Sequence, residues 1–551
     1  MHCLRSLLVA LLAAPALANA PAEAQAPSAA WVPGATCYEV FVRSFKDSNG
    51  DGVGDLNGLI SALDYINDGN PKSTRSLGAR CLWLMPVMES PGYHGYDVSD
   101  YYRVAPAYGT NEDFKRLVVE ARRRGIAVIV DMVLNHVSSA HPAFQTALRD
   151  PTSPYRHWFR FAPTKGPHNR WGNNNWHRSP VRDEWYYGFF WQGMPDLNYD
   201  RPEALQEMQR VAAFWLNEMG VDGLRLDAVK YLAEDGAVVE DTPRTHAVLR
   251  DYAAFVRQAK PGAFTVGEVF DSTGTLLSYY PDQLDAYFAF EVADSLIAGV
   301  RRGDARGILP PVLRLQQALP ATRWAPFLRN HDQPRTRTEL GGDWAKARVA
   351  SFLLLTLPGL PFVYYGEELG MAGAKPDERI RTPMPWSRST PHAGFTDGTP
   401  WQPLADDSLE ANVEAQNGRE GTLLSLHRAL IPLRSRTPAL ARGTLVPLTT
   451  SDAAVLAFLR RDGDATVLVV ANVGARAQRN VVVTMDAAAG RGQMRALFGD
   501  TRRWTLRREA DGSQRVTIPE LPPHDGAILA LPAAASARPP AAPRPTPPER
   551  R

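Results

Sequence analysis

The chain has 551 residues, 44% of them hydrophobic and 22% charged, which is enough for two or three domains with a large buried core. Its formal net charge of +2 gives no strong attraction to nucleic acid or to a membrane surface, and we expect neither as a partner. After the N-terminal region, no stretch is long and apolar enough to span a bilayer.

The N-terminus has the features of a secretory signal peptide. Arg5 supplies a positive charge, residues 7–12 form an apolar run, and Ala18-Asn19-Ala20 is a small-residue cleavage site. We therefore expect a signal peptide over residues 1–20 and a flexible leader over 21–30. The mature protein is expected to be a secreted or periplasmic monomer.

Two cysteines, Cys37 and Cys81, remain in the mature chain near the starts of apolar runs. If these runs are neighbouring strands, a disulfide is sterically possible in an oxidising compartment. The alternative is two separate buried thiols that act as small hydrophobic side chains.

Short apolar runs alternate with helical spacing along the first part of the chain. Residues 38–42, 81–86 and 126–130 are strand candidates, and apolar residues recur with helical spacing over 112–124, so the order predicts a βαβ unit. After Asn135-His136 the pattern breaks for about sixty residues, which predicts an inserted subdomain over 137–200.

The second half of the chain first resumes the same alternation. The sequence predicts a helix over 203–219. Further strand candidates are residues 221–228, 264–267, 286–292, 326–328 and 360–365. From about residue 440 the runs become short, β-rich and separated by turn residues, which predicts a small antiparallel β domain over 438–532. Residues 533–551 are rich in Pro, Ala and Arg and are predicted to be disordered.

Four of the apolar runs end in residues that can do chemistry. They lead into Asp131 with Asn135-His136, into Arg225 and Asp227, into Glu268, and into Asn330-His331-Asp332. In a parallel barrel the C-terminal ends of the strands meet at one face, so these stretches predict a single site.

Three carboxylates dominate the predicted site, and they suit a retaining glycosidase. Asp227 lies next to Arg225, whose charge is expected to keep it ionised as the nucleophile. Neighbouring anions are expected to raise the pKa of Glu268, so that it holds a proton as the acid. Asp332 is expected to stay anionic and to stabilise the developing positive charge. The alternative is a set of structural ion pairs at loop starts.

The four stretches resemble the sequence regions of the alpha-amylase family of glycoside hydrolases. Residues 131–136, 223–228, 267–269 and 327–332 resemble its first to fourth regions in order, and the resemblance covers residues 31–535. It implies an α/β fold: a (β/α)8 TIM barrel over 31–136 and 201–437, a subdomain inserted after the third strand, and a C-terminal antiparallel β-sandwich.

The resemblance also implies residue roles. By the family pattern Asp227 is the nucleophile, Glu268 the acid/base and Asp332 the transition-state stabiliser. The implied substrate-binding residues are Tyr96, His136, Arg225, Lys230 and His331, with Tyr96 stacking under the sugar.

Three features of this resemblance bear on specificity. Residues 194–198 have the form of members intermediate between oligo-1,6-glucosidases and neopullulanases. Tyr93 stands where exo-acting α-glucosidases usually have an Asp, which favours α-1,4-glucans entering past the first subsite. Lys230 has the spacing of an amylase residue that holds the next sugar, but it is followed by Tyr231 rather than His.

The predicted function is therefore retaining hydrolysis of α-1,4-glycosidic bonds in starch or maltodextrins. The alternatives are an α-glucosidase or a transglycosylase on the same scaffold, such as a trehalose-forming enzyme. A non-catalytic carbohydrate-binding protein is the alternative of another class, but such a protein would be expected to have lost a carboxylate of the triad.

Residues 47–55 form a second chemical signal. Side-chain oxygens at alternate positions, with glycines between them, supply the oxygen ligands that Ca²⁺ requires. Similar loops bind calcium in the alpha-amylase family, and the predicted ligands are Asp47, Asn49, Asp51, Asp55 and the carbonyl of Val53. The alternative is an Asx-rich turn that caps itself without a metal.

Overall fold

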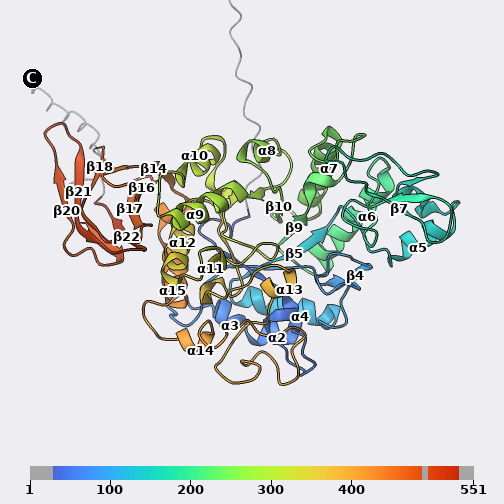
Figure 1. The fold of residues 1–551 in the computed structure, drawn as a ribbon, viewed down its shortest axis with the longest axis horizontal. Helices are drawn as coiled ribbons and strands as arrows, with labels where there is room; N and C mark the ends of the chain where they lie inside the picture. The colour runs from blue at the N-terminus through green and yellow to red at the C-terminus, as the bar shows by residue number, and fades with distance from the viewer. Residues whose placement is uncertain (1–28, 487–493, 533–551) are drawn as a thin grey trace, which may run out of the picture.

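The computed structural model describes residues 29–486 and 494–532. The predicted signal peptide, most of the predicted leader and the predicted tail lie outside these residues. The described chain forms a central barrel, with an inserted subdomain on one side and a β domain on the other (Figure 1). Within the described residues no helix is long and apolar enough to cross a membrane.

In the described part of the chain, eight parallel strands form the barrel sheet, in the order β12-β11-β10-β9-β5-β2-β1-β13. Their bounds are β1 (Cys37–Val40), β2 (Cys81–Leu84), β5 (Ala127–Val133), β9 (Gly223–Asp227), β10 (Phe264–Gly267), β11 (Ala286–Phe288), β12 (Trp324–Ala325) and β13 (Phe362–Tyr364). The backbone N–H groups of Leu360 and Phe362 donate to the carbonyls of Trp324 and Pro326 at 3.0 and 2.9 Å, which closes the ring.

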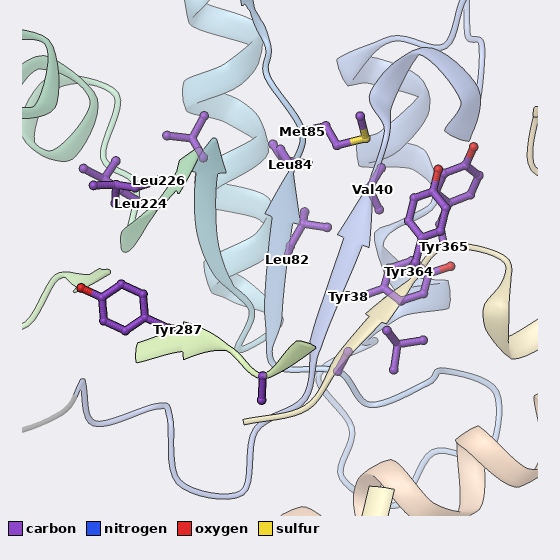
Figure 2. Close-up of a cluster of buried hydrophobic side chains, with 14 of the residues drawn as sticks. Tyr38, Val40, Leu82, Leu84, Met85, Leu224, Leu226, Tyr287, Tyr364 and Tyr365 are labelled. Carbon is purple, nitrogen blue, oxygen red and sulfur yellow. The ribbon is translucent and has the colours of Figure 1, made fainter. Parts of the chain in front are cut away.

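Alternation along the strands separates two apolar clusters. On β2, Cys81 and Trp83 belong to a cluster inside the barrel, whereas Leu82 and Leu84 belong to the larger cluster between strands and helices. Figure 2 shows side chains of this larger cluster, including Leu82, Leu84 and Leu224. The same alternation on β9 turns Arg225 and Asp227 toward the barrel axis.

Helices cover the outside of the barrel. The longer ones are α4 (Asn111–Arg123), α6 (Pro202–Ala213), α7 (Pro243–Ala259), α9 (Phe290–Arg302), α10 (Leu309–Ala318), α12 (Trp344–Thr356) and α15 (Leu423–Arg436). Shorter ones are α1 (Val42–Phe45), α2 (Leu56–Ser61), α3 (Leu63–Ile66), α8 (Thr273–Leu277), α11 (Thr336–Glu339), α13 (Asp377–Ile380), α14 (Val413–Gln416) and α16 (Pro438–Arg442). Thr110 and Asp113 form a capping box at the start of α4, which explains why this predicted helix begins there.

The inserted subdomain leaves the barrel after β5 and returns before α6. It contains α5 (Pro142–Arg149) and a small antiparallel sheet of β6 (Phe161–Ala162), β8 (Trp185–Tyr187) and β7 (Trp176–Arg178). An antiparallel bridge between His136 and Asp196 joins its two ends, so it is anchored directly beside a predicted site residue.

Two antiparallel sheets form the C-terminal domain in the described residues. One has the order β14 (Thr444–Pro447), β16 (Val455–Asp462), β17 (Ala465–Asn472), β22 (Asp525–Ala530) and β19 (Arg495–Phe498). The other has β15 (Thr449–Thr450), β18 (Gln478–Met485), β21 (Gln514–Leu521) and β20 (Thr505–Arg508). Their inner faces share one apolar cluster, so the domain is a sandwich.

The buried Arg460 of β16 ties the sandwich to the barrel. Its guanidinium donates to the carbonyls of Thr356, Leu440 and Gly443 at 2.6 to 3.0 Å, and Thr356 is the last residue of α12. A guanidinium at this position satisfies carbonyls that the end of a helix leaves without partners.

Some predicted element bounds were wrong. The candidate strand over 286–292 ends at Phe288, and its second half is the start of α9; Val42 begins α1 rather than ending β1. The run 326–328 lies just after β12. A short apolar run does not distinguish a buried strand from a buried helix, because both bury every side chain. Ala29, in the predicted leader, is buried under the barrel.

Cys37 and Cys81 form a disulfide, which decides between the two alternatives. They are direct neighbours at the starts of β1 and β2, and both are fully buried inside the barrel. The bond therefore lies at the end of the barrel opposite the C-terminal strand ends.

Removal of this disulfide should lower stability without lowering activity. The bond spans 44 residues, and a loop of this size contributes about 4 kcal/mol by the chain-entropy estimate. We expect Cys37→Ala with Cys81→Ala to unfold at lower urea, followed by tryptophan fluorescence, with unchanged activity under folding conditions. Wild-type protein unfolded in dithiothreitol is the matched control, and an unchanged midpoint in both would contradict the prediction.

Candidate active site

Polar side chains from several strands meet at the C-terminal end of the barrel. Asp131 lies on β5, Arg225 and Asp227 lie on β9, Glu268 follows β10, and Asp332 lies in the loop after β12. A cavity of about 390 Å³ opens there. It is lined by His94, Tyr96, His136, Phe190, Met194, Asp227, Ala228, Lys230, Tyr231, Glu268, Phe270, Asp332, Asp377 and Arg381. The structure thus brings the three predicted catalytic carboxylates to one cavity.

Arg225 binds three carboxylates at once. Its side chain is fully buried, and Nη1 donates to both oxygens of Asp131 at 2.9 Å and to Asp227 Oδ1 at 2.7 Å. Nη2 donates to Glu268 Oε2. Arg225 therefore lies beneath the cavity rather than in its wall, and it orients the carboxylates that face the substrate space.

Asp332 belongs to a second charged group. Its Oδ1 accepts a hydrogen bond from Arg381 Nη2 at 2.9 Å, and its Oδ2 lies 3.1 Å from His331 Nε2. The other ring nitrogen of His331 bonds to Glu39, a buried carboxylate of β1. His331 is fully buried, so it supports Asp332 from below instead of lining the cavity.

Tyr96 and His136 both line the cavity, as the substrate-binding prediction requires. The Tyr96 ring stacks on His331 with centroids 5.5 Å apart, and its hydroxyl donates to Asp131 Oδ2 at 3.1 Å. These contacts fix the plane of the ring at the cavity. Burial lowers the pKa of His136 to about 3, so this imidazole is neutral at pH 7.

Lys230 lines the cavity as well, but its ammonium faces acceptors of the protein. The Nζ atom lies 2.6 Å from Asp271 Oδ2 and 3.1 Å from Glu240 Oε2. In this structure the Lys230 ammonium is therefore engaged by protein carboxylates, and it is not free for the predicted contact with the substrate.

Burial and charge separate the protonation of Glu268 and Asp227. Burial raises the pKa of Glu268 to about 7; Arg225 opposes this, while Asp227 and Asp332 add to it. Burial also raises the pKa of Asp227 to about 6 and outweighs Arg225. The sequence analysis expected Arg225 to hold the Asp227 carboxyl ionised, and therefore to lower its pKa. The raised pKa of Asp227 corrects that expectation. The order is as expected, because Glu268 keeps its proton to higher pH.

Asp332 has the opposite environment. Burial alone would raise its pKa, but His331 and Arg381 outweigh burial and hold the pKa well below its usual range. In turn, burial would lower the pKa of His331, yet Asp332 and Glu39 raise it to about 10. Asp332 is therefore an anion and His331 a cation at pH 7, as the predicted role of Asp332 requires.

Among the charged side chains at the site, Glu39, Asp377 and Arg381 were not predicted. Glu39 had a usable signal, since a carboxylate inside the apolar strand Cys37–Val40 must have a partner. Arg381 Nη2 donates to Asp377 Oδ2 at 3.0 Å. Asp377 begins the short helix α13 and Arg381 directly follows it, and no strand or motif in the sequence marks either residue.

The predicted calcium ligands lie in one loop before α2. The side chains of Asp47, Asn49, Asp51 and Asp55 each accept a hydrogen bond from a backbone N–H of the same region, one of them from Val53. A carboxylate or amide oxygen has two lone pairs, so Asn49 and Asp51 keep acceptor capacity for a cation. The Asp47 carboxylate already accepts hydrogen bonds from three backbone N–H groups and from the Thr396 hydroxyl, which occupy both of its oxygens. Within the described residues, no three His, Cys, Asp or Glu side chains form a metal-binding group, so a bound Ca²⁺ would depend on the amide and carbonyl ligands as well. Calcium binding stays a prediction.

The comparison with known families agrees with this geometry. Residues 39–443 match the alpha amylase catalytic domain, and residues 447–519 match the maltogenic amylase C-terminal domain. The chain belongs to the alpha-amylase family of glycoside hydrolases. The predicted TIM barrel with a C-terminal β domain is confirmed, and so is the prediction that the protein is a glycosidase.

The relatives of this chain carry the names of different activities. Alpha-amylase 3 of Dictyoglomus thermophilum is 38% identical over 445 residues, which is 80% of this chain and 84% of the relative. A trehalose synthase/amylase of Mycobacterium tuberculosis is 35% identical over 500 residues, covering 80% and 81%. The crystal structure of an alpha-amylase from H. orenii superimposes with a TM-score of 0.79 at 37% identity, covering 90% of this chain and 99% of that one.

The pKa order predicts a narrow bell-shaped pH profile. Below about pH 6 Asp227 gains a proton and loses its nucleophilic oxygen; above about pH 7 Glu268 loses the proton that it must donate. We expect kcat/KM on maltotriose to fall on both sides, with apparent pKa values near 6 and 7. A flat profile from pH 5 to pH 8, about one unit beyond each pKa, would contradict the assignment.

Proposed function

We propose that the protein is a retaining hydrolase of α-1,4-glucosidic bonds in starch or maltodextrins. The observation that carries this proposal is that Asp227 and Glu268 bind the two terminal nitrogens of the Arg225 guanidinium and both line the cavity. Two carboxyl groups oriented toward one space are what a double displacement uses. The relatives named alpha-amylase support the choice of α-glucans as substrate.

In the first step Asp227 attacks the anomeric carbon while Glu268 donates its proton to the glycosidic oxygen. The bond between the sugar and the leaving alcohol breaks, and a glycosyl ester of Asp227 forms. The positive charge that develops on the sugar ring lies near Asp332, which His331 and Arg381 keep anionic. Tyr96 supplies a flat surface held in place by His331 and Asp131.

In the second step Glu268, now ionised, removes a proton from water. The water oxygen attacks the anomeric carbon, the ester bond to Asp227 breaks, and the product leaves with its original α configuration. The raised pKa of Glu268 serves both steps, because the group must be an acid first and a base afterwards.

A second candidate is a trehalose-forming transglycosylase. The Mycobacterium tuberculosis relative named trehalose synthase/amylase favours it, and so does one feature of the cavity. Arg381 joins Asp377 to Asp332, and its Nη1 lies 3.4 Å from the Tyr93 hydroxyl, so this wall of the cavity carries linked polar groups. In such an enzyme a second sugar replaces water in the second step.

A product time course distinguishes these functions. With soluble starch, maltotriose and maltose followed by proton NMR, we expect α-anomeric maltooligosaccharides to appear first from starch. Trehalose formed from maltose would support the second candidate instead.

We expect Asp227→Asn to lose activity by about 10⁴-fold or more while retaining its fold and maltotriose binding. Activity near that of the wild type would contradict the nucleophile assignment.

We also propose that the 47–55 loop binds Ca²⁺ as a structural ion, and that the protein is exported as a monomer. Oxygen ligands at alternate positions support the first proposal. The apolar N-terminal run, together with a disulfide that requires an oxidising compartment, supports export.

Calcium removal should destabilise the protein through this loop. We expect excess chelator to lower the melting temperature and added Ca²⁺ to restore it. Asp51→Ala removes one of the predicted ligands and should lose most of this calcium response. The substitution should otherwise disturb the fold little, because Asp51 is exposed and its side chain bonds within the loop. A melting temperature that does not respond to chelation, with metal removal verified by elemental analysis, would contradict the calcium proposal.

A further inference from the structure

The surroundings of Lys230 point to a role other than sugar binding. Lys230 lies in the short helix η3 (Val229–Tyr231) directly after β9, and its side chain is 4% exposed. Its Nζ donates to Asp271 Oδ2 at 2.6 Å and to the Phe270 carbonyl at 3.4 Å, and Glu240 Oε2 lies 3.1 Å away. An ammonium has three N–H donors, and these three acceptors lie within hydrogen-bonding distance of it. A third carboxylate, Asp241, lies slightly farther away, with its Oδ2 at 3.9 Å.

The acceptors of Lys230 belong to different loops. Phe270 and Asp271 follow Glu268 in the loop after β10, whereas Glu240 lies in the loop that leads to α7. Glu240 is buried and also binds Arg170 of the inserted subdomain. Lys230 is thus in the middle of a chain of alternating charges that runs from the subdomain to the Glu268 loop.

The ion pair with Asp271 is charged at neutral pH. Burial would raise the pKa of Asp271, but hydrogen bonds from Lys230 and neighbouring groups lower it to about 2. The pair also lies beside an exposed apolar side chain, Phe270, which is 60% exposed at the cavity and packs on Phe290. Without Lys230, the carboxylates of Glu240, Asp241 and Asp271 would face one another across the gap between the loops.

We propose that Lys230 is a positioning residue that fixes the loop carrying Glu268, and that it does not contact the sugar on the leaving-group side. This inference rests on the proposed role of Glu268 as the acid. A displaced acid gives less help to a poor leaving group, and misplacement of a reacting group by about 1 Å can cost roughly a hundredfold in rate.

Aryl maltosides test this proposal, because they have no sugar on the leaving-group side. We expect Lys230→Met to lower kcat/KM roughly 10- to 100-fold on 4-methoxyphenyl α-maltoside, whose poor leaving group needs the acid. The loss should be clearly smaller on 4-nitrophenyl α-maltoside, whose leaving group needs little protonation. It should fall mainly on kcat, and Lys230→Arg should retain much of the activity because it keeps the cation.

Two results would overturn the proposal. If Lys230 contacts the sugar, Lys230→Met will match the wild type on both aryl maltosides and lose activity on maltotriose. If Lys230 merely stabilises the fold, both aryl substrates will lose activity equally. Should Lys230→Met fail to fold, Asp271→Asn weakens the same contact and should show the same dependence on the leaving group.

Two controls complete the experiment. Lys260 is also surrounded by oxygens, the carbonyls of Leu216, Gly220 and Val221, but at the start of β9, so Lys260→Met should not change the leaving-group dependence. Glu268→Gln should show a strong leaving-group dependence. If it shows none, the proposed role of Glu268 fails; if it does and Lys230→Met does not, only the inference about Lys230 fails.

Discussion

The catalytic end of the barrel depends on one buried guanidinium. Arg225 is fully enclosed, and its guanidinium bonds to Asp131, Asp227 and Glu268 around it. Loss of either side of such a buried cluster leaves an uncompensated charge, which costs about 3–5 kcal/mol in comparable cases. The cluster holds the strand ends of β5, β9 and β10 in register with the cavity above them. The same ion pairs therefore stabilise this end of the barrel and orient the carboxyl groups.

Protonation is divided between two charged groups that share this cavity. Around Arg225 burial raises the pKa values of Glu268 and Asp227, the neighbouring carboxylates add to this, and the single guanidinium does not offset it. Around Asp332 the cations His331 and Arg381 prevail, and its pKa is lowered. One site can thus hold a proton on one carboxyl and a permanent negative charge on another a short distance away.

The periphery of the site is assembled from loops that the barrel brings together. Phe190 and Met194 come from the inserted subdomain, Phe270 from the loop after β10, and Arg381 from the segment after β13. Loops can vary without disturbing the barrel, because the strands and helices bury their own apolar faces. Such variation is compatible with one fold whose members carry names as different as alpha-amylase and trehalose synthase.

The sequence by itself determined the family, the barrel with its insertion, and the three carboxylates, because these follow from local patterns. Alternation on β9 places Arg225 and Asp227 on one face, and strand ends in a parallel barrel meet at one face wherever the rest of the chain lies. Only the tertiary structure decided which groups bind each other. Glu39 and His331 are 292 residues apart, the Cys37–Cys81 bond requires β1 and β2 to be neighbours, and the ammonium of Lys230 binds acceptors from two other loops. The physical reason is that hydrogen bonds and ion pairs act over about 3 Å, and only the folded backbone determines which residues come that close.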